Sequence, residues 1–522
     1  MKSLIASEQA RLWWLLAGIA AMFAFSMGTH PFIPSMEPRF GEVIREMLAH
    51  GEYLIPIKNG VPYIEYPPLY FWLSLAGRLT GLPETVAIRL PAALAFLLWM
   101  LWLARLQRRL NPGWPTYLLP LIGAALPGVL YTFFIAQSDT VLILGTLIGI
   151  TGYLRLQQAS DAGEDPGFPW ELWIGVTLAT LAKGPVGMMV TLPVLALDIL
   201  FAPLPGNASW WRTVLERAKT TAWLRGLGLV LLFNVPWYIA AGMREGWEMV
   251  RAVVVYQNFT RFLVGFDHIQ PWYYYGITMW YDMLPMTFAL PFALYLGFKR
   301  WNQRLWRLPL LWLLWTVFFF SLSASKQGKY ILTAAPAMAL LGLQTLQILS
   351  NKRWWQRLRI TLQSWALLLL AGFAIAAVFI LPRYSDKVGG IGGLEKIRTI
   401  VQQKPGELIS YDWPRSMELY ILGSPMNYVR SSRELYTKIH DGKFKPGSYL
   451  LVQKRHLARP GQVPGSRILS PVPAPPYFKL ITSVKFNGTL YLYRILPDAN
   501  DMPIPNTPVP PPHHWWERFD TD

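Results

Sequence analysis

The sequence predicts a polytopic α-helical membrane protein with a small soluble α/β domain at its C-terminal end. Hydrophobic residues make up 53% of the 522 residues and charged residues only 15%, whereas a soluble chain carries about 25% charged residues. Apolar stretches long enough to cross the hydrocarbon core of a bilayer recur as far as Leu381. Beyond this point the pattern changes to short apolar runs separated by turn residues, which are typical of strands.

The apolar stretches predict about eleven to thirteen transmembrane helices. The eleven candidates are Leu12–Gly28, Ile88–Leu106, Pro115–Phe134, Thr140–Leu156, Trp170–Ala182, Gly184–Phe201, Leu227–Gly242, Tyr281–Phe298, Leu308–Ser323, Ile331–Leu349 and Ile360–Leu381. They assign residues 1–382 to a membrane domain.

The formal net charge of +18 is explained by the loops between these helices. With a cytoplasmic N-terminus, nearly every second loop holds a basic cluster, as the positive-inside rule requires. The clusters are Arg105, Arg108 and Arg109; Arg212, Arg217, Lys219 and Arg225; Lys299, Arg300, Arg304 and Arg307; and Lys352, Arg353, Arg357 and Arg359. The exception is the acidic loop Gln157–Pro169, but acidic residues count little in the rule. The charge therefore predicts cytoplasmic loops and no nucleic-acid partner.

The chain contains no cysteine, which excludes disulfides, cysteine-ligated zinc, iron–sulfur clusters and thiol catalysis. Glu65 and His268 are the pair that could hold a divalent metal, but no compact ligand spacing supports such a site. We therefore expect no metal site and no required cofactor.

The first external loop, residues 29–87, is too long to be a simple connector. Glu37–His50 has helical spacing, with Phe40, Val43, Ile44 and Met47 on one face. This pattern predicts an amphipathic helix lying on the membrane, and Leu69–Leu79 predicts a second one.

Residues 383–497 are predicted to form a separate soluble α/β domain on the external side. A helix is expected over Ser432–Ile439, and Asn487-Gly488 is a hairpin turn signal. The expected strands are Leu408–Tyr411, Tyr449–Val452, Phe478–Ser483 and Thr489–Arg494. Residues 498–522 are a Pro-rich tail, which we expect to be loosely ordered.

The topology places many ionisable residues on the external side, where such groups near membrane depth are functional candidates. The carboxylates are Glu37, Glu65 and Asp139; the cations are Lys183, Arg251, Arg261, Lys326 and Lys329, beside an aromatic-rich rim. Cations suit a phosphate leaving group, and a carboxylate can act as a general base on an acceptor hydroxyl. Together they indicate group transfer from a phosphate-activated donor embedded in the membrane.

The same residues form motifs that resemble those of the C-type integral-membrane glycosyltransferases. The resemblance is to the branch that contains the lipid A aminoarabinose transferases and protein O-mannosyltransferases, and it extends over roughly residues 10–380 and the external domain. The motifs are Glu37-Pro38-Arg39-Phe40 (similar to D-E-x-R-Y), Asn59-Gly60, Glu65-Tyr66-Pro67-Pro68-Leu69 (similar to E-K-P-P-L), Ser138-Asp139, Lys183-Gly184-Pro185, and Ser325-Lys326 with Tyr330-Ile331-Leu332 (similar to S-K-x-x-x-Y-x-L-P). Two positions depart from the pattern: Met36 stands at the family's first Asp, and Tyr66 stands at the Lys after the second Glu.

The resemblance implies the GT-C fold and transfer of a sugar from a polyprenyl-phosphate donor, most simply undecaprenyl phosphate, on the periplasmic face of a bacterial inner membrane. The acceptor would be lipid A, another glycan or a protein. It implies that Glu37 and Asp139 are the carboxylates of the catalytic centre. The substrate-binding residues would be Arg39, Glu65, Tyr66, Lys183, Arg251, Arg261, His268, Lys326, Lys329 and Tyr330.

Each candidate also has a purely structural interpretation. Glu37 can favour the dipole of the helix that it begins, Asp139 can cap a helix, and Lys183 can extend from a helix end to the interface. Two other functions remain open on the residues alone. A flippase for a lipid-linked sugar would use the same cations without a general base, and a scaffold would tolerate changes to all the external charges.

Overall fold

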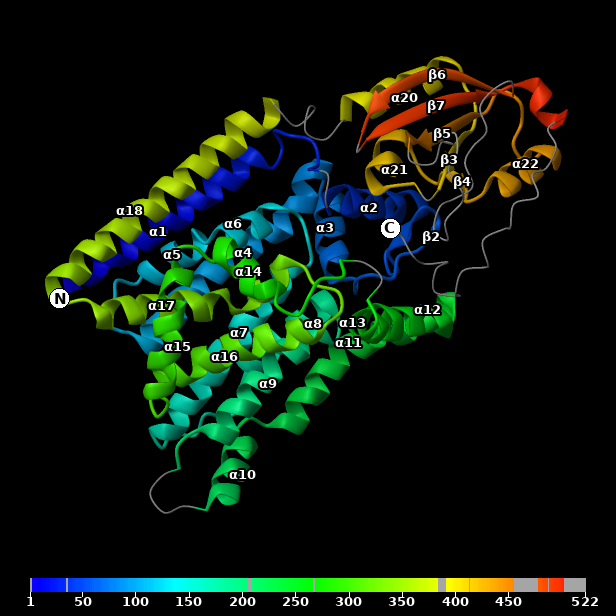
Figure 1. Ribbon diagram of the computed structural model, residues 1–522. Coiled ribbons are helices and arrows are strands. Elements are labelled where there is room, and N and C mark those ends of the chain that lie inside the picture. Colours follow the sequence, from blue (N-terminus) through cyan, green and yellow to red (C-terminus); the bar gives the residue numbers. More distant parts are fainter. Residues whose placement is uncertain are drawn as a thin grey trace. The chain divides into compact units, whose positions relative to one another are not determined.

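The computed structural model describes residues 2–33, 36–204, 209–265, 268–383, 391–412, 414–454, 477–486 and 488–501. It divides into two compact units, the first with Met1–Thr29 and Ile64–Phe379, and the second with His30–Tyr63 and Ile380–Asp522. The first unit is helical, and the second carries a sheet (Figure 1). Asn487 of the predicted hairpin turn and the tail from residue 502 lie outside the described residues.

The first unit is built from helices throughout. Its elements are α1 (Lys2–Ser26), α3 (Leu69–Leu79), α4 (Glu84–Leu110), α5 (Leu118–Ala124), α6 (Pro127–Phe134), α7 (Asp139–Asp161), α8 (Trp170–Lys183), α9 (Val186–Phe201), α10 (Trp210–Thr220), α11 (Trp223–Glu245), α12 (Trp247–Arg251), η1 (Ala252–Thr260), α13 (Arg261–Leu263), α14 (Tyr274–Asp282), η2 (Met286–Ala289), α15 (Leu290–Lys299), α16 (Arg304–Leu322), η3 (Gly328–Ala334), α17 (Ala335–Leu349), α18 (Lys352–Ile375) and η4 (Ala376–Ile380).

Within the described part of the chain, 6 helical stretches are long and apolar enough to cross a membrane. They are Glu84–Leu110, Asp139–Asp161, Trp210–Glu245, Arg304–Leu322, Gly328–Leu349 and Lys352–Arg383. Two shorter apolar helices, Val186–Phe201 and Met286–Lys299, accompany them. The prediction of a polytopic helical membrane protein is therefore confirmed.

Proline interrupts expected spans that the sequence analysis treated as continuous. The stretch Pro115–Phe134 becomes α5 and α6, because Leu126 is extended (φ −65°, ψ 122°) immediately before Pro127. Proline disfavours the helical conformation of the residue before it and donates no hydrogen bond itself. Within Tyr281–Phe298, α14 ends at Asp282 and regular α-helix resumes only at Leu290, after the short 3₁₀ helix η2.

Helices α7 and α8 pack closely through glycines. Ideal Cβ atoms placed on Gly145 and Gly175 would overlap the backbone of the facing helix, at Ala179 N for Gly145 (2.7 Å) and at Gly149 N for Gly175. Small residues that let backbones approach closely are the usual interface of membrane helices. Helix α8 runs antiparallel to α7, since Gly145 faces Ala179 and Gly152 faces Leu172. This contact therefore holds the start of α7 close to the end of α8.

We expect that Gly175→Ala destabilises the protein by about 1–3 kcal/mol, because the added methyl group must push α7 and α8 apart. Thermal unfolding of the purified protein in detergent measures the effect. Gly228→Ala on α11 is the matched control, since a Cβ at Gly228 meets nothing within 4 Å. Equal melting temperatures for the two variants would contradict the close packing.

Residues of two basic clusters contact the acidic loop Gln157–Pro169 at one end of the first unit. At the end assigned to the cytoplasm, Arg304 binds Asp161 at 2.6 Å, and Arg109 donates to Gln158 at 3.1 Å. Asp161 is the last residue of α7 and belongs to the acidic loop, so the loop that is the exception to the positive-inside rule pairs with a basic cluster of another loop.

The second unit contains a five-stranded mixed sheet in the order β4-β3-β5-β7-β6. Strands β4, β3 and β5 are parallel, and β7 pairs antiparallel with both β5 and β6. The elements after residue 380 are α20 (Ile391–Gln403), β3 (Leu408–Tyr411), α21 (Ser416–Leu422), β4 (Asn427–Val429), α22 (Ser432–His440), β5 (Tyr449–Gln453), β6 (Phe478–Lys485), β7 (Thr489–Ile495) and η6 (Pro497–Asp501). All four predicted strands and the predicted helix are confirmed; β4, α20 and α21 were not predicted.

The first loop contributes α2 (Glu37–His50) and the short hairpin β1 (Ile57–Lys58) and β2 (Val61–Pro62) to this second unit. The predicted helices Glu37–His50 and Leu69–Leu79 are confirmed with the same bounds. Residues 29–87 are predicted to belong together to the membrane domain, whereas the compact units divide this loop after Tyr63.

The apolar face of α2 is covered by protein, which corrects the prediction that it lies on the membrane. Phe40, Val43, Ile44 and Met47 are all fully buried. The Arg45 guanidinium lies 4.1 Å from the ring centroid of Tyr420, on α21, and donates to the Tyr420 carbonyl at 2.6 Å. Helical periodicity reveals an apolar face but does not distinguish lipid from protein as its partner.

The Asn59-Gly60 motif is the turn of the β1–β2 hairpin. Both residues have positive φ (51° and 75°), as a tight two-residue hairpin turn requires. The Asn59 amide also donates to the Met426 carbonyl at 3.3 Å and accepts from its N–H at 2.7 Å. This motif therefore has a structural role inside the second unit.

The stability of the second unit is expected to fall as pH rises from about 5 to about 8. Burial raises the pKa of the Glu42 carboxyl from 4.5 to about 7, and the charge of Glu46 adds to this rise. The folded protein thus holds the proton more tightly than the unfolded chain, so stability is greatest below pH 4.5 and about 3 kcal/mol is lost as pH passes 7.

Amide hydrogen exchange of α2 in the intact protein, corrected for the intrinsic pH dependence, measures this loss. Glu42→Gln cannot ionise and should flatten the profile. An unchanged profile in Glu42→Gln would assign the pH dependence to other groups.

Candidate active site

A buried carboxylate between two ammonium groups forms the centre of the candidate site in the first unit. Asp139 is only 1% exposed. Its Oδ1 accepts a hydrogen bond from Lys183 Nζ, and its Oδ2 lies 3.1 Å from Lys329 Nζ. A charge buried this deeply is stable only when it is paired, so the two lysines hold Asp139 ionised.

Three separate elements bring these residues together. Asp139 is the first residue of α7, Lys183 is the last residue of α8, and Lys329 lies at the start of η3. A carboxylate at a helix N-terminus and a cation at a helix C-terminus each interact favourably with the helix dipole. The structure does not support the two structural interpretations in the form expected: Ser138, and not Asp139, is the N-cap residue of α7, and Lys183 pairs with Asp139 instead of extending to the interface.

Gln137 and Tyr330 complete the cluster around the two lysines. Lys329 Nζ donates to Gln137 Oε1 at 3.0 Å, and Gln137 Nε2 donates to the Thr132 carbonyl at 2.9 Å. Lys183 Nζ lies 4.4 Å from the centroid of the Tyr330 ring, within cation–π range. Tyr330 is predicted by its motif, whereas Gln137 is not predicted, because it is a neutral side chain whose only signal in the sequence is its place in the turn before Asp139.

Arg261 adds a third positive charge to this neighbourhood. It begins α13, donates to Gln257 at 3.2 Å, and is near enough for its charge to act on Lys183. Arg251, at the end of α12, is exposed. The structure thus relates Arg261 to the cluster, while the role expected for Arg251 stays a prediction.

Lys326 joins two loops instead of pairing with a carboxylate. Its Nζ donates to the Gln270 carbonyl at 2.9 Å and to the Ser323 carbonyl, and its backbone N–H donates to the His268 carbonyl at 3.0 Å. His268 itself is exposed and has a positive φ of 47°. Lys326 is therefore positioned to order the loop that leads to Lys329.

The other predicted residues lie in the first loop. Glu37 is fully buried at the start of α2 in the second unit, where its Oε2 accepts from Ile33 N–H at 2.9 Å, and Arg39 follows on the same helix. Glu65 and Tyr66 belong to the first unit and precede α3; Tyr66 is buried and Glu65 is half-buried. Their expected roles toward a substrate stay predictions.

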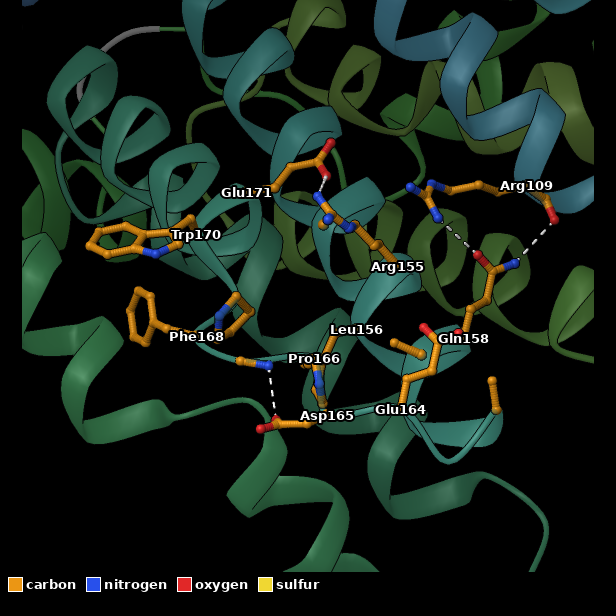
Figure 2. A pocket seen from close by; sticks show the side chains of 15 residues that line it. Arg109, Arg155, Leu156, Gln158, Glu164, Asp165, Pro166, Phe168, Trp170 and Glu171 are labelled. Carbon is orange, nitrogen blue, oxygen red and sulfur yellow. Dashed lines mark hydrogen bonds and ion pairs between the residues drawn. The ribbon is translucent and has the colours of Figure 1, made fainter.

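A large polar cavity lies at the opposite end of α7 from Asp139. Its volume is about 660 Å³, and Figure 2 shows Arg155 and Glu171 facing each other and Arg109 bonded to Gln158. Arg155 is sixteen residues along α7 from Asp139, about 24 Å at 1.5 Å per residue. This cavity is therefore separate from the charged cluster.

The described residues contain no group of three His, Asp or Glu side chains that could hold a metal ion. The expectation that the protein requires no metal and no cofactor stays a prediction.

No protein-family model matches the chain. The sequence is 26% identical, over 363 residues, to the undecaprenyl phosphate-alpha-4-amino-4-deoxy-L-arabinose arabinosyl transferase 1 of Pseudomonas fluorescens (strain Pf0-1), covering 64% of this chain and 58% of the relative. It is 29% identical, over 329 residues, to the corresponding transferase of Edwardsiella ictaluri (strain 93-146), covering 60% and 56%. The match thus spans less than two thirds of the length of these relatives. An uncharacterised protein of Aquifex aeolicus (strain VF5) is 25% identical over 381 residues, covering 70% of this chain and 69% of that protein.

The fold is similar to that of two crystal structures of ArnT from Cupriavidus metallidurans. The one bound to undecaprenyl phosphate superposes with a TM-score of 0.65 and 17% identity, and the apo form with 0.66 and 17%. Each comparison covers 92% of this chain and 98% of the other chain. The chain therefore has the GT-C membrane fold seen in these ArnT structures.

Proposed function

We propose that the protein is a glycosyltransferase that moves a sugar from a polyprenyl-phosphate donor, most simply undecaprenyl phosphate, to a lipid or glycan acceptor. The observation that carries this proposal is the cluster of Asp139, Lys183 and Lys329 at one end of the helical unit. Support comes from the likeness to transferases that act on undecaprenyl phosphate-linked aminoarabinose and to an ArnT structure bound to undecaprenyl phosphate.

The charges of the cluster suit the donor. Asp139 and the two lysines sum to one net positive charge, and Arg261 adds a second. A polyprenyl-phosphate sugar is a phosphodiester with one negative charge, whereas the departing polyprenyl phosphate is a monoester that carries up to two. The extra cation therefore stabilises charge that develops as the sugar leaves, which is how preorganised charges accelerate a reaction.

The reaction forms a bond between an acceptor oxygen and the anomeric carbon of the sugar. The bond between that carbon and the phosphate oxygen breaks, and its electron pair leaves with the phosphate. A hydroxyl acceptor also gives its proton to a carboxylate, whereas an acceptor phosphate is already ionised. Asp139, held by two ammonium groups, is a weak base, so its main contribution is to hold the lysines in place. Glu37 remains the alternative base that the sequence resemblance implies.

The proposed location is the inner membrane of a bacterium, with the cluster and the second unit facing the periplasm. The basic loops, which the positive-inside rule assigns to the cytoplasm, lie at the opposite end of α7 from Asp139. The acceptor, whether lipid A, another glycan or a protein, would be approached from this external side.

The donor class is tested with the purified protein in liposomes, supplied in parallel with polyprenyl-phosphate sugars and nucleotide sugars plus an envelope lipid extract. Mass spectrometry of the products identifies both the sugar and the acceptor. We expect glycosylated product only with the polyprenyl donors. Product from nucleotide sugars alone would overturn the proposed donor class.

A further inference from the structure

A polar stripe on α14 faces the segment that carries Lys329. Tyr274, Thr278 and Asp282 recur every four residues and so lie on one face of this helix. A Cβ atom placed on Gly328 would lie 2.8 Å from Asp282 Oδ2 and 4.0 Å from Thr278 Cβ. The Tyr274 hydroxyl also interacts with the backbone of Gly328. The whole stripe therefore borders Gly328.

This position places the stripe beside the charged cluster. Gly328 directly precedes Lys329, whose ammonium group binds Asp139 and Gln137. On its other side Asp282 lies against α6, where a Cβ on Gly128 would come within 2.9 Å of both Asp282 Cβ and Oδ1. Gly128 and Gly328 have no side chain and thus leave room for the Asp282 carboxyl group. Gly328 directly precedes Lys329, a member of the charged cluster.

Two polar atoms of the stripe, one on Asp282 and one on Thr278, are unsatisfied among the described residues. Asp282 Oδ2 and Thr278 Oγ1 are buried and have no hydrogen-bond partner within the described parts of the chain. Asp139 is paired with two lysines, whereas Asp282 forms no ion pair with another described residue. Buried polar atoms normally have partners, and unpaired carboxyl groups inside membrane proteins mark functional sites by default.

We propose that Asp282 and Thr278 form a subsite that accepts hydrogen bonds from an N–H or O–H group on the sugar of the donor. The inference rests on the proposed glycosyltransferase function. A carboxyl group without a neighbouring cation repels phosphate, so the donor phosphate belongs with the lysines and the sugar with α14. An ammonium group on the sugar gains the stronger, charge-assisted hydrogen bond, so the subsite favours amino sugars over neutral ones.

The test compares two polyprenyl-phosphate donors that differ only in an amino group or a hydroxyl group at one sugar carbon. KM and kcat are measured for the wild type, Asp282→Asn and Thr278→Val in liposomes. Asp282→Asn should raise KM for the amino-sugar donor by about 10-fold or more and KM for the neutral donor by much less. Thr278→Val should raise KM for both donors by a few-fold.

Thr316→Val on α16 is the matched control, because Thr316 Oγ1 is also buried and has no partner among the described residues. It should leave both KM values unchanged. Unchanged donor preference in Asp282→Asn, or KM changes in Thr278→Val no larger than in Thr316→Val, would overturn the subsite while the proposed function stands.

The proposed function fails separately if the wild type transfers sugar from neither donor. The subsite is then judged by the increase in melting temperature that each donor causes. A larger increase with the amino-sugar donor that disappears in Asp282→Asn would support the subsite; equal increases in both proteins would overturn it.

Discussion

Asp139→Asn should lower the rate of sugar transfer by at least about 100-fold, in the range found when one preorganised charge is removed from an active site. The amide keeps the shape of the side chain but removes the charge that holds Lys183 and Lys329. The two ammonium groups then repel each other and lose the geometry that receives the donor phosphate. Single-turnover kinetics with saturating donor measure this loss directly.

Asp198→Asn controls for the loss of a buried charge, because Asp198 is equally buried and lies on α9, near the end assigned to the cytoplasm. The Asp198→Asn protein that folds should transfer sugar at the wild-type rate. If Asp139→Asn kept more than a tenth of the wild-type rate, Asp139 would not be required for sugar transfer.

Arg307→Met should destabilise the protein by about 3–5 kcal/mol, the usual cost of leaving one partner of a buried ion pair alone. Arg307 Nε lies 2.8 Å from Asp198 Oδ1, and both side chains are 2% exposed. Tyr153 donates to the other oxygen, Oδ2, at 2.8 Å. The three residues join α16, α9 and α7, so the melting temperature in detergent should fall markedly.

The double variant Arg307→Met with Asp198→Leu separates the cost of an unpaired charge from the cost of lost packing. Replacing both partners of a buried pair by apolar residues is often neutral or stabilising, so the double variant should recover most of the loss. A double variant as unstable as the single one would show that packing, and not the unpaired carboxylate, determines the effect.

Strong local patterns made much of the fold predictable from sequence. Glu37–His50 and Leu69–Leu79 have their predicted bounds because helical periodicity and flanking turn residues agree. The three-residue strand β4 carries too few residues for a pattern, and it is defined by pairing with β3. Pro127 marks the break between α5 and α6, but the continuous apolar run around it predicts a single span.

The candidate site was predictable where charges interrupt apolar sequence. Asp139, Lys183, Lys329 and Tyr330 were selected at helix ends, and the fold brings them together. Asp282 was missed because it lies near the start of a stretch treated as a transmembrane span. Lys326 was selected for its charge, but its ammonium group binds backbone carbonyls, and only tertiary structure could distinguish these two uses.

The measurement that tests the central claim most directly follows a donor with an isotopically labelled sugar in sealed liposomes that contain an acceptor. A transferase breaks the bond between sugar and phosphate, so labelled acceptor and free polyprenyl phosphate should appear in equal amounts. Both should be lost in Asp139→Asn. Intact labelled donor that crosses the bilayer, with no free polyprenyl phosphate formed, would contradict sugar transfer and identify the protein as a flippase.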